Sequence, residues 1–343
     1  MPALSFKLKI GGLDAGSDPA KSGAQLLRLR ITLTMDGAGG RCTLALAATD
    51  FTLPKPGDPV TVALDPGDGA ADVFTGEVVT VAATADEVRI DASDGLSKLG
   101  RLEYEEVFEK QTAGKIARAL LDAAGLQAGT VADGPSFPSY VLHRGPRALA
   151  HLQRLAEQCG VDLFTDGAGK VHFAGPQQRG EQHTFKAREH VLAVQLAMAT
   201  PTRDGVVVWG EGAASTKGEA KSHWLADDLA SVSGKAGVGA DGTAKKGSAG
   251  QRPHSVFDGA VRTGQVAGDL AAARALARAS RSVRGHVDVL GAPAVVPGDI
   301  IQFESFSAGM PAIAAIAGTA GLRVRQVTHT LGAATGFVTR LEF

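Results

Sequence analysis

Four glutamates about a third of the way along the chain are its strongest candidates for chemistry: Glu103, Glu105, Glu106 and Glu109. Two such carboxylates could serve a glycoside hydrolase, in which an apolar pocket must raise the pKa of one acid. Aromatic residues make up only 5% of the chain, and too few lie near this run to line a sugar cleft. We therefore favour a solvated or subunit-facing run of charge, with a peptidoglycan hydrolase as the alternative.

The other side chains that could do chemistry lack the spacing of a site. The nine histidines are dispersed, and His143 and His151, which flank a predicted helix start, are interpreted as capping or surface residues. Residues 237–242 match a glycine-rich dinucleotide-binding pattern, but no apolar strand precedes them and no helix follows. The sequence thus predicts no catalytic residue, no metal site and no cofactor.

The composition argues against several kinds of partner. With 35 basic and 36 acidic residues the net charge is -1, which implies no general attraction to nucleic acid or to an anionic membrane. The longest apolar stretch, residues 309–322, is broken by a proline and two glycines and is shorter than the ~20 residues that cross a bilayer. The first residues lack the pattern of a secretory signal, which predicts synthesis in a bacterial cytoplasm. Cys42 and Cys159 are interpreted as buried apolar residues.

Residues 1–97 carry the pattern of short β-strands. Residues 5–10 and 27–33 alternate apolar and polar side chains, which is typical of strands with one buried face. Further apolar runs follow, separated by turns rich in Gly, Pro and Asp. This part of the sequence predicts a small β-barrel or sandwich.

Residues 98–185 change character and predict an α+β module. Thr112 is a candidate cap for a helix that stops at Gly125, and a second helix is expected to begin near Pro146 and to stop at Gly160. Two short apolar runs around a glycine turn then predict a β-hairpin.

Residues 186–343 return to strands and predict a second β-barrel. A segment rich in Gly, Ala, Ser and Lys, at about residues 210–250, is interpreted as a surface loop or flexible arm. A helix is predicted from Asp269 to about Arg284. The fold class is therefore mainly β with an α+β insertion.

An internal repeat links the first and last parts of the chain. Residues 56–58 and 297–299 both read Pro-Gly-Asp, and each triplet is followed by a Val-rich strand and then by an alternating strand. The later matches are residues 78–81 with 324–327, and 88–91 with 338–341. Recurrence in this order predicts two similar barrels in one chain, so that three copies would present six near-equivalent barrels around a ring.

Two longer segments carry a resemblance to a known family. Residues 140–161 hold an extended strand that leads into a helix ending in Leu-Ala-Glu shortly before a glycine, and residues 291–299 and 323–341 read as a closing barrel. In this combination the sequence resembles the late control protein D family of contractile phages, which is equivalent to baseplate hub proteins and to the hub half of the VgrG spike proteins. The resemblance covers nearly the whole chain apart from the glycine-rich segment.

The resemblance implies a structural hub and not an enzyme. In that family the hub is a homotrimer, bound above to the tail tube and below to a spike. The chain ends at Phe343 after its last predicted strand, so a separate spike protein is expected in place of the fused spike of VgrG proteins. Baseplate wedge proteins and the tape measure are further expected partners, and a secreted effector or adhesin is a second alternative function.

One departure from the family suggests a contact surface. The apolar stretch of residues 307–320 looks longer than the usual turn between barrel strands. Because exposed apolar patches tend to mark interfaces, we predict a trimer or spike contact through Met310, Ile313 and Ile316. A loop that folds over its own barrel is an equal alternative.

Overall fold

The computed structural model describes residues 4–18, 22–37, 39–67, 69–175, 180–198, 203–210, 232–238, 244–279, 281–304, 310–318 and 321–343. The chain is mainly β, as the sequence predicts, with its strands distributed over several sheets.

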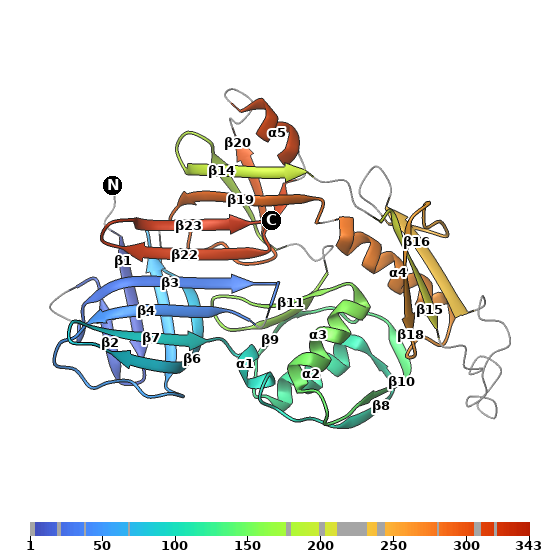
Figure 1. Ribbon diagram of the computed structural model, residues 1–343, viewed down its shortest axis with the longest axis horizontal. Coiled ribbons are helices and arrows are strands. Elements are labelled where there is room, and N and C mark those ends of the chain that lie inside the picture. The colour runs from blue at the N-terminus through green and yellow to red at the C-terminus, as the bar shows by residue number, and fades with distance from the viewer. Residues whose placement is uncertain are drawn as a thin grey trace.

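The largest sheet joins the first part of the chain to the last. Eleven strands pair in the order β14-β19-β23-β22-β3-β4-β7-β6-β5-β1-β2. Their bounds are β1 (Ser5–Ile10), β2 (Leu13–Gly16), β3 (Leu26–Thr34), β4 (Arg41–Ala47), β5 (Pro59–Asp65), β6 (Ala71–Ala83), β7 (Glu87–Ser93), β14 (Val191–Met198), β19 (Val283–Leu290), β22 (Gln326–Gly332) and β23 (Gly336–Glu342). In Figure 1 the blue strands continue directly into the red ones where β3 lies beside β22.

Alternating side chains explain why these segments form strands. In β3, Leu29, Ile31 and Leu33 are buried, whereas Arg28 and Arg30, which alternate with the first two of them, are exposed. Apolar side chains from β1 and from β4 to β7 meet this row in one core. Burial of each such leucine or isoleucine stabilises the folded chain by about 1.5–3 kcal/mol. The alternation with a period of two therefore favours a strand and also determines which of its faces is buried.

The middle module contains both predicted helices and the predicted hairpin. Its elements are α1 (Leu96–Leu99), β8 (Glu106–Thr112), α2 (Ala113–Ala123), β9 (Ala128–Val131), β10 (Ser136–Leu142), α3 (Ala148–Cys159), β11 (Asp162–Thr165) and β12 (Val171–Ala174). The Oγ1 atom of Thr112 accepts a hydrogen bond from the Lys115 backbone N–H at 3.3 Å and so caps α2. Gly160 ends α3 in the left-handed conformation, with φ 65°.

A second α+β piece follows, where the sequence predicted part of a second β-barrel with a loop at about residues 210–250 and a helix from Asp269. It consists of β15 (Gly205–Gly210), β16 (Ser233–Val238), β17 (Ala244–Lys246), β18 (Pro253–Asp258) and α4 (Gly264–Ala279). Strands β16 and β17 correct the loop prediction for their residues, while residues 211–231 and 239–243 of the glycine-rich segment lie outside the described residues. Strand β16 consists largely of small residues that give little hydrophobic signal in the sequence, although Gly234 packs closely against α4.

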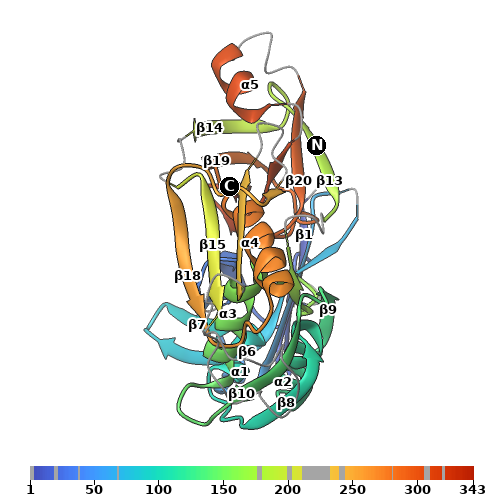
Figure 2. The ribbon, with the colours of Figure 1, turned by 90° about the vertical axis from the view of Figure 1, so that its right-hand side faces the viewer.

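The predicted helix near residue 269 begins earlier than expected. The side chain of Thr263 accepts a hydrogen bond from the Val266 backbone N–H at 3.3 Å, which starts α4 at Gly264. Val206 and Val208 of β15 and Leu270 of α4 belong to the same core as the helices of the middle module. Helix α4 packs against β16 and β15, and Figure 2 shows it beside β15. This piece therefore packs with the middle module.

The remaining elements are β13 (Gln182–Lys186), β20 (Ile300–Glu304), α5 (Pro311–Ala317) and β21 (Leu322–Arg323), and β13, β20 and β21 form a small sheet. Helix α5 contacts β14 and β20, as Figure 2 shows at the top of the view. Among the described residues, no helix combines the length and the apolar character needed to cross a bilayer.

Both Pro-Gly-Asp triplets form the same turn. Gly57 and Gly298 have φ 94° and 100°, which only glycine adopts readily. The Gly57 backbone N–H donates to the Val78 carbonyl at 2.9 Å, and the Gly298 N–H donates to the Val324 carbonyl at 2.9 Å. Val78 and Val324 are the residues that the sequence repeat pairs, so these backbone contacts support that repeat.

Strand order recurs along with the turn. The first part of the chain has the order β3-β4-β7-β6-β5-β1, and the last part has β14-β19-β23-β22/β21-β20-β13, with β21 and β22 together in the place of β6. One difference is that β1 pairs antiparallel with β5 whereas β13 pairs parallel with β20. Strand pairing among the described residues closes neither part into a barrel.

Candidate functional site

Two glutamates of the acidic run form exposed ion pairs, and Glu106 accepts a hydrogen bond from the Tyr104 hydroxyl. Glu103 pairs with Arg147, and the Glu105 carboxylate lies 2.7 Å from the Arg144 guanidinium. Both glutamate side chains are more than half exposed, at 54% and 58%. A general acid for glycoside hydrolysis needs an apolar pocket, so this geometry supports the solvated charge run and not the hydrolase.

The two histidines near α3 contact each other. His151 is buried, unlike the predicted surface residue, and its Nε2 atom lies 2.8 Å from the backbone oxygen of His143. The described residues contain no cluster of His, Cys, Asp and Glu arranged to hold a metal ion. Of the dinucleotide-like pattern, Gly237 and Val238 end strand β16, and the other four positions lie outside the described residues.

The predicted contact residues lie on and before α5. Met310 precedes the helix and is 40% exposed, whereas Ile313 and Ile316 are half-buried against the core that includes β19, β22 and β23. Residues 305–309 and 319–320 of the surrounding stretch lie outside the described residues. An interface role for the three side chains stays a prediction. Ile313 and Ile316 also pack against the hydrophobic core of their own chain.

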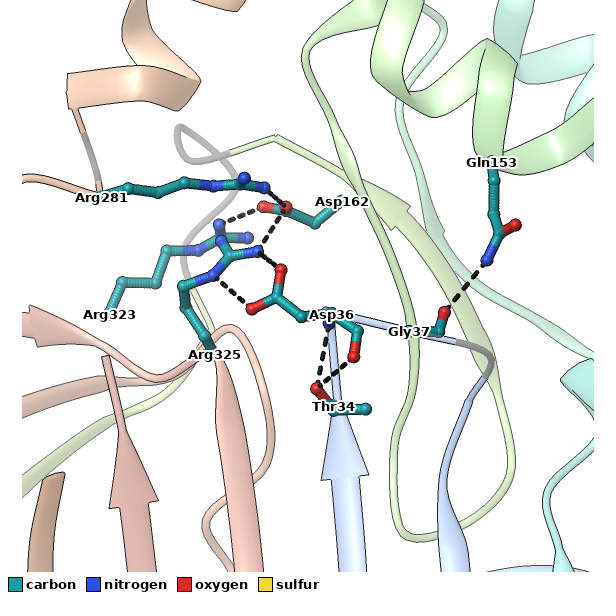
Figure 3. Close-up of polar contacts among 8 residues, drawn as sticks. All are labelled: Thr34, Asp36, Gly37, Gln153, Asp162, Arg281, Arg323 and Arg325. Carbon is teal, nitrogen blue, oxygen red and sulfur yellow. Dashed lines mark hydrogen bonds and ion pairs between the residues drawn. The ribbon is translucent and has the colours of Figure 1, made fainter. Parts of the chain in front are cut away.

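The principal polar site is a cluster of ion pairs centred on Asp162. Its carboxylate accepts from Arg323 at 2.5 Å, from Arg325 at 3.2 Å and from Arg281 at 3.3 Å. Arg325 also holds Asp36 through two hydrogen bonds of 2.7 and 3.1 Å. Figure 3 shows all five side chains converging on one point. We call these five residues the Asp162 cluster.

The Asp162 cluster ties together segments that are distant in sequence. Asp36 follows β3, Asp162 begins β11 of the middle module, and Arg323 and Arg325 flank the break between β21 and β22. Although burial by itself would raise the pKa of Asp162, the Arg325 and Arg323 guanidiniums hold it below its usual range. A hydrogen bond from Arg325 likewise lowers the pKa of Asp36. Both carboxylates of the cluster are therefore charged at neutral pH.

A second buried carboxylate joins the same parts of the chain. Asp94 accepts hydrogen bonds from the backbone N–H groups of Gly40 and Leu96, at 2.5 and 3.1 Å, and from the hydroxyl of Thr165. Burial raises the pKa of Asp94, and these hydrogen bonds partly offset that shift. The contacts link the turn before β4, helix α1 and strand β11.

Sequence reasoning missed both carboxylates. A signal was present for the first, because Arg323 and Arg325 stand two residues apart in an apolar strand and so lie on one face. Arginines in such a position require acidic partners. The partners themselves, at positions 36 and 162, follow only from the tertiary structure.

A basic cleft of about 620 Å³ adjoins the cluster. Six arginines line it, against two aspartates and one glutamate: Arg154, Arg203, Arg274, Arg278, Arg281 and Arg284. Burial, and then the charges of Arg278, Arg203 and Arg274, lower the pKa of His254 in its wall. The side chains that line the cleft therefore carry a net positive charge.

A histidine is buried at the junction of β3 with β22, and its burial makes the stability of the fold depend on pH. His329 is fully buried, its Nδ1 atom lies 3.0 Å from the Thr339 hydroxyl, and its Nε2 atom has no partner among the described residues. Burial lowers its pKa from 6.5 to about 3. The unfolded chain therefore binds a proton that the folded chain excludes, and stability falls as the pH drops from about 6.5 toward 3, by about 1.4 kcal/mol per pH unit.

We accordingly expect His329→Asn, which retains a partner for Thr339, to lower stability at pH 7 and to flatten its decline in acid. Denaturant unfolding of both proteins between pH 7 and pH 4 measures the two slopes. Parallel slopes would contradict a neutral buried His329.

The fold has known relatives. A protein-family model described as the phage tail baseplate hub (GPD) matches residues 25–331. The 43 kDa tail protein of prophage MuSo2 from Shewanella oneidensis has a similar structure, with 16% identity, a TM-score of 0.66 and coverage of 98% of this chain and 97% of that one. A tail protein from Neisseria meningitidis is 12% identical, with a TM-score of 0.63 and coverage of 99% and 96%.

A third similar structure is an Escherichia coli component of the type VI secretion system, which is itself described as similar to T4 bacteriophage tail proteins. It is 12% identical, with a TM-score of 0.59, over 98% of this chain and 76% of that one. No curated protein matches the chain.

Proposed function

Because the chain belongs to the phage tail baseplate hub (GPD) family, we propose that it forms a trimeric ring between the six-fold tail tube and the three-fold central spike. It is a structural component of the baseplate and not an enzyme. The proposed particle is a contractile phage tail or a phage-tail-like injection device. The tube protein would bind above the ring and a separate spike protein below it.

The observation that carries this proposal is the strand order that recurs in the first and last parts of the chain. The turns at Gly57 and Gly298 make the same backbone contacts, and the strands around them pair in the same order. A chain with two equivalent units offers six equivalent surfaces when three copies assemble. We infer that each unit closes into a small barrel in the ring and that the six barrels meet the six-fold tube.

Mass measurement and electron microscopy of the assembled protein test the proposal. The expected result is a trimer that appears as a three-fold ring around a tube-sized opening and that co-purifies with tube and spike proteins. A protein that stays monomeric and never enters particles would overturn it. Loss of turbidity in a peptidoglycan suspension, abolished by substitution of Glu103 or Glu105, would instead support the hydrolase.

A further inference from the structure

Two of the strand edges that lack a partner among the described residues lie on β14 and on the second half of β6. Strand β14 ends the largest sheet and pairs only with β19. Strand β6 pairs with β5 as far as Glu77, so its second half, residues 79–83, pairs only with β7. Exposed apolar side chains lie on both edges, with Met198 at 69% and Val79 at 52%. Open edges of this kind readily pair with a strand of another chain.

The internal repeat holds at the level of individual strand pairs. Pro59 follows the first Pro-Gly-Asp triplet and pairs with Glu77, and Ile300 follows the second triplet and pairs with Arg323. The next strands correspond in the same way. The cross-strand pair Val81–Ile90 of the first unit corresponds to Val327–Leu341 of the second, and Leu44–Ile90 corresponds to Val287–Leu341. One numbering offset for each strand therefore superimposes the two units. It aligns Ile90 with Leu341, so residues 88–91 correspond to 339–342, one position further along than the sequence repeat predicted.

Even an irregularity recurs. The β3–β4 register shifts between Leu26 and Arg28, and the β14–β19 register shifts between Val191 and Ala193. Strand β14 thus occupies in the second unit the place of β3 in the first. The corresponding residues are Ile31 with Leu196, Thr32 with Ala197, and Leu33 with Met198.

Within the chain, β3 is the strand that joins one unit to the other. It pairs antiparallel with β22, where Leu33 faces Val327 and Thr32 faces Thr328. Leu33 and Val327 are buried there, and the two threonine hydroxyls lie 3.3 Å apart. Strand β22 corresponds to the second half of β6, with Val327 equivalent to Val81 and Thr328 to Ala82. Each partner in this junction therefore has a counterpart on an open edge.

We propose that β14 of one copy pairs antiparallel with the second half of β6 in the next copy, with Met198 opposite Val81, Ala197 opposite Ala82, and Leu196 opposite Ala83. The contact joins two different edges, so it propagates head to tail, and it closes into the proposed ring when successive copies are related by a three-fold rotation. It repeats between copies the junction that β3 and β22 make within each copy. The inference rests on the proposed ring and adds the surfaces and the register that form it.

The side chains at these positions suit such a contact. All six are apolar, so no like charges face each other across the two strands. Met198 is equivalent to the buried Leu33, and pairing would remove its exposed surface from water in the same way. Alanine at positions 82 and 197 leaves room for close approach where the internal junction has two threonines.

Cysteine cross-linking tests the register. Directly opposite residues in antiparallel strands have Cα atoms about 4.5–5.5 Å apart, within the range that a disulfide spans. The variant Ala82→Cys/Ala197→Cys should therefore form covalent dimers and trimers on mild oxidation of the assembled protein. Native Cys42 and Cys159 are buried and free, and burial raises the pKa of the Cys159 thiol to about 12, so neither should interfere.

The matched control is Ala82→Cys/Ala193→Cys. Ala193 is also exposed on β14 and is four residues from Ala197, a displacement of about 13 Å along the strand. It should cross-link at least about tenfold less, because a disulfide cannot span that displacement. Equal cross-linking of both variants, or none in protein that is trimeric by mass, would overturn the register and leave the proposed function standing. A protein that is monomeric by mass would overturn the proposed function itself.

A second variant tests the proposed contact at the β14 edge without introducing cysteines. Met198→Asp should prevent the ring, measured by mass, because it places a charge in the predicted strand contact. Val141→Asp changes an equally exposed valine on β10, away from both edges, and should leave the ring intact. If Met198→Asp assembled as well as the unaltered protein, the proposed contact would be wrong.

Discussion

Replacing Asp162 by asparagine should lower the free energy of unfolding by about 3–5 kcal/mol, because it leaves the buried Arg323 guanidinium without its countercharge. Arg323 and Arg325 are 7% and 8% exposed at their side chains. Arg325 keeps Asp36 as a partner, but Arg323 has no other ion pair among the described residues, and two of its nitrogens already lack hydrogen bonds. Denaturant unfolding at neutral pH measures the loss.

The pH dependence of this variant has a definite sign. The pKa of Asp162 is lower in the folded chain than in the unfolded one. Its contribution is therefore present above the unfolded pKa of about 4 and is lost as the pH falls through the folded pKa. The difference in unfolding free energy between Asp162→Asn and the unaltered protein should be largest at pH 7 and should shrink in acid below about pH 4.

An exposed ion pair provides the control for the Asp162 cluster. Glu87 pairs with Arg28 across the surface of the large sheet, where the arginine side chain is 61% exposed. Glu87→Gln should cost less than about 1 kcal/mol, because water solvates both groups. If the two substitutions had equal effects, burial would not be what makes the Asp162 cluster important.

Gly160→Ala should be the second severe substitution, with an expected loss of about 2–5 kcal/mol. Gly160 ends α3 with φ +65°, and an added Cβ atom would lie 2.6–2.8 Å from the backbone of Ala273 and Arg274 in α4. The substitution therefore combines an unfavourable backbone conformation with a collision between two helices. Thermal or denaturant unfolding would measure the effect.

Gly125 separates the two causes. It follows α2 with nearly the same φ, +66°, but an added Cβ atom would meet nothing within 4 Å. Gly125→Ala should thus cost only the conformational penalty, about 1–2 kcal/mol. Similar losses for the two variants would mean that α3 and α4 can move apart freely at Gly160, contrary to the packing described above.

Local patterns in the sequence predicted much of the fold. The alternation in β3, the cap at Thr112 and the stops at Gly125 and Gly160 are each set by a few neighbouring residues. Predictions failed where local signals were weak. Strand β16 consists largely of small residues, and the loop prediction there gave no weight to the close packing of Gly234 against α4.

The sequence by itself determined the mainly β character, the helices of the middle module and the repeat of the Pro-Gly-Asp turn, because short-range periodicity and turn chemistry decide them. Only the tertiary structure decided that β3 pairs with β22, that Asp162 gathers three arginines, and that Gly160 touches α4. These contacts join residues more than a hundred positions apart, and no local pattern specifies which strand edge or which charge becomes the partner.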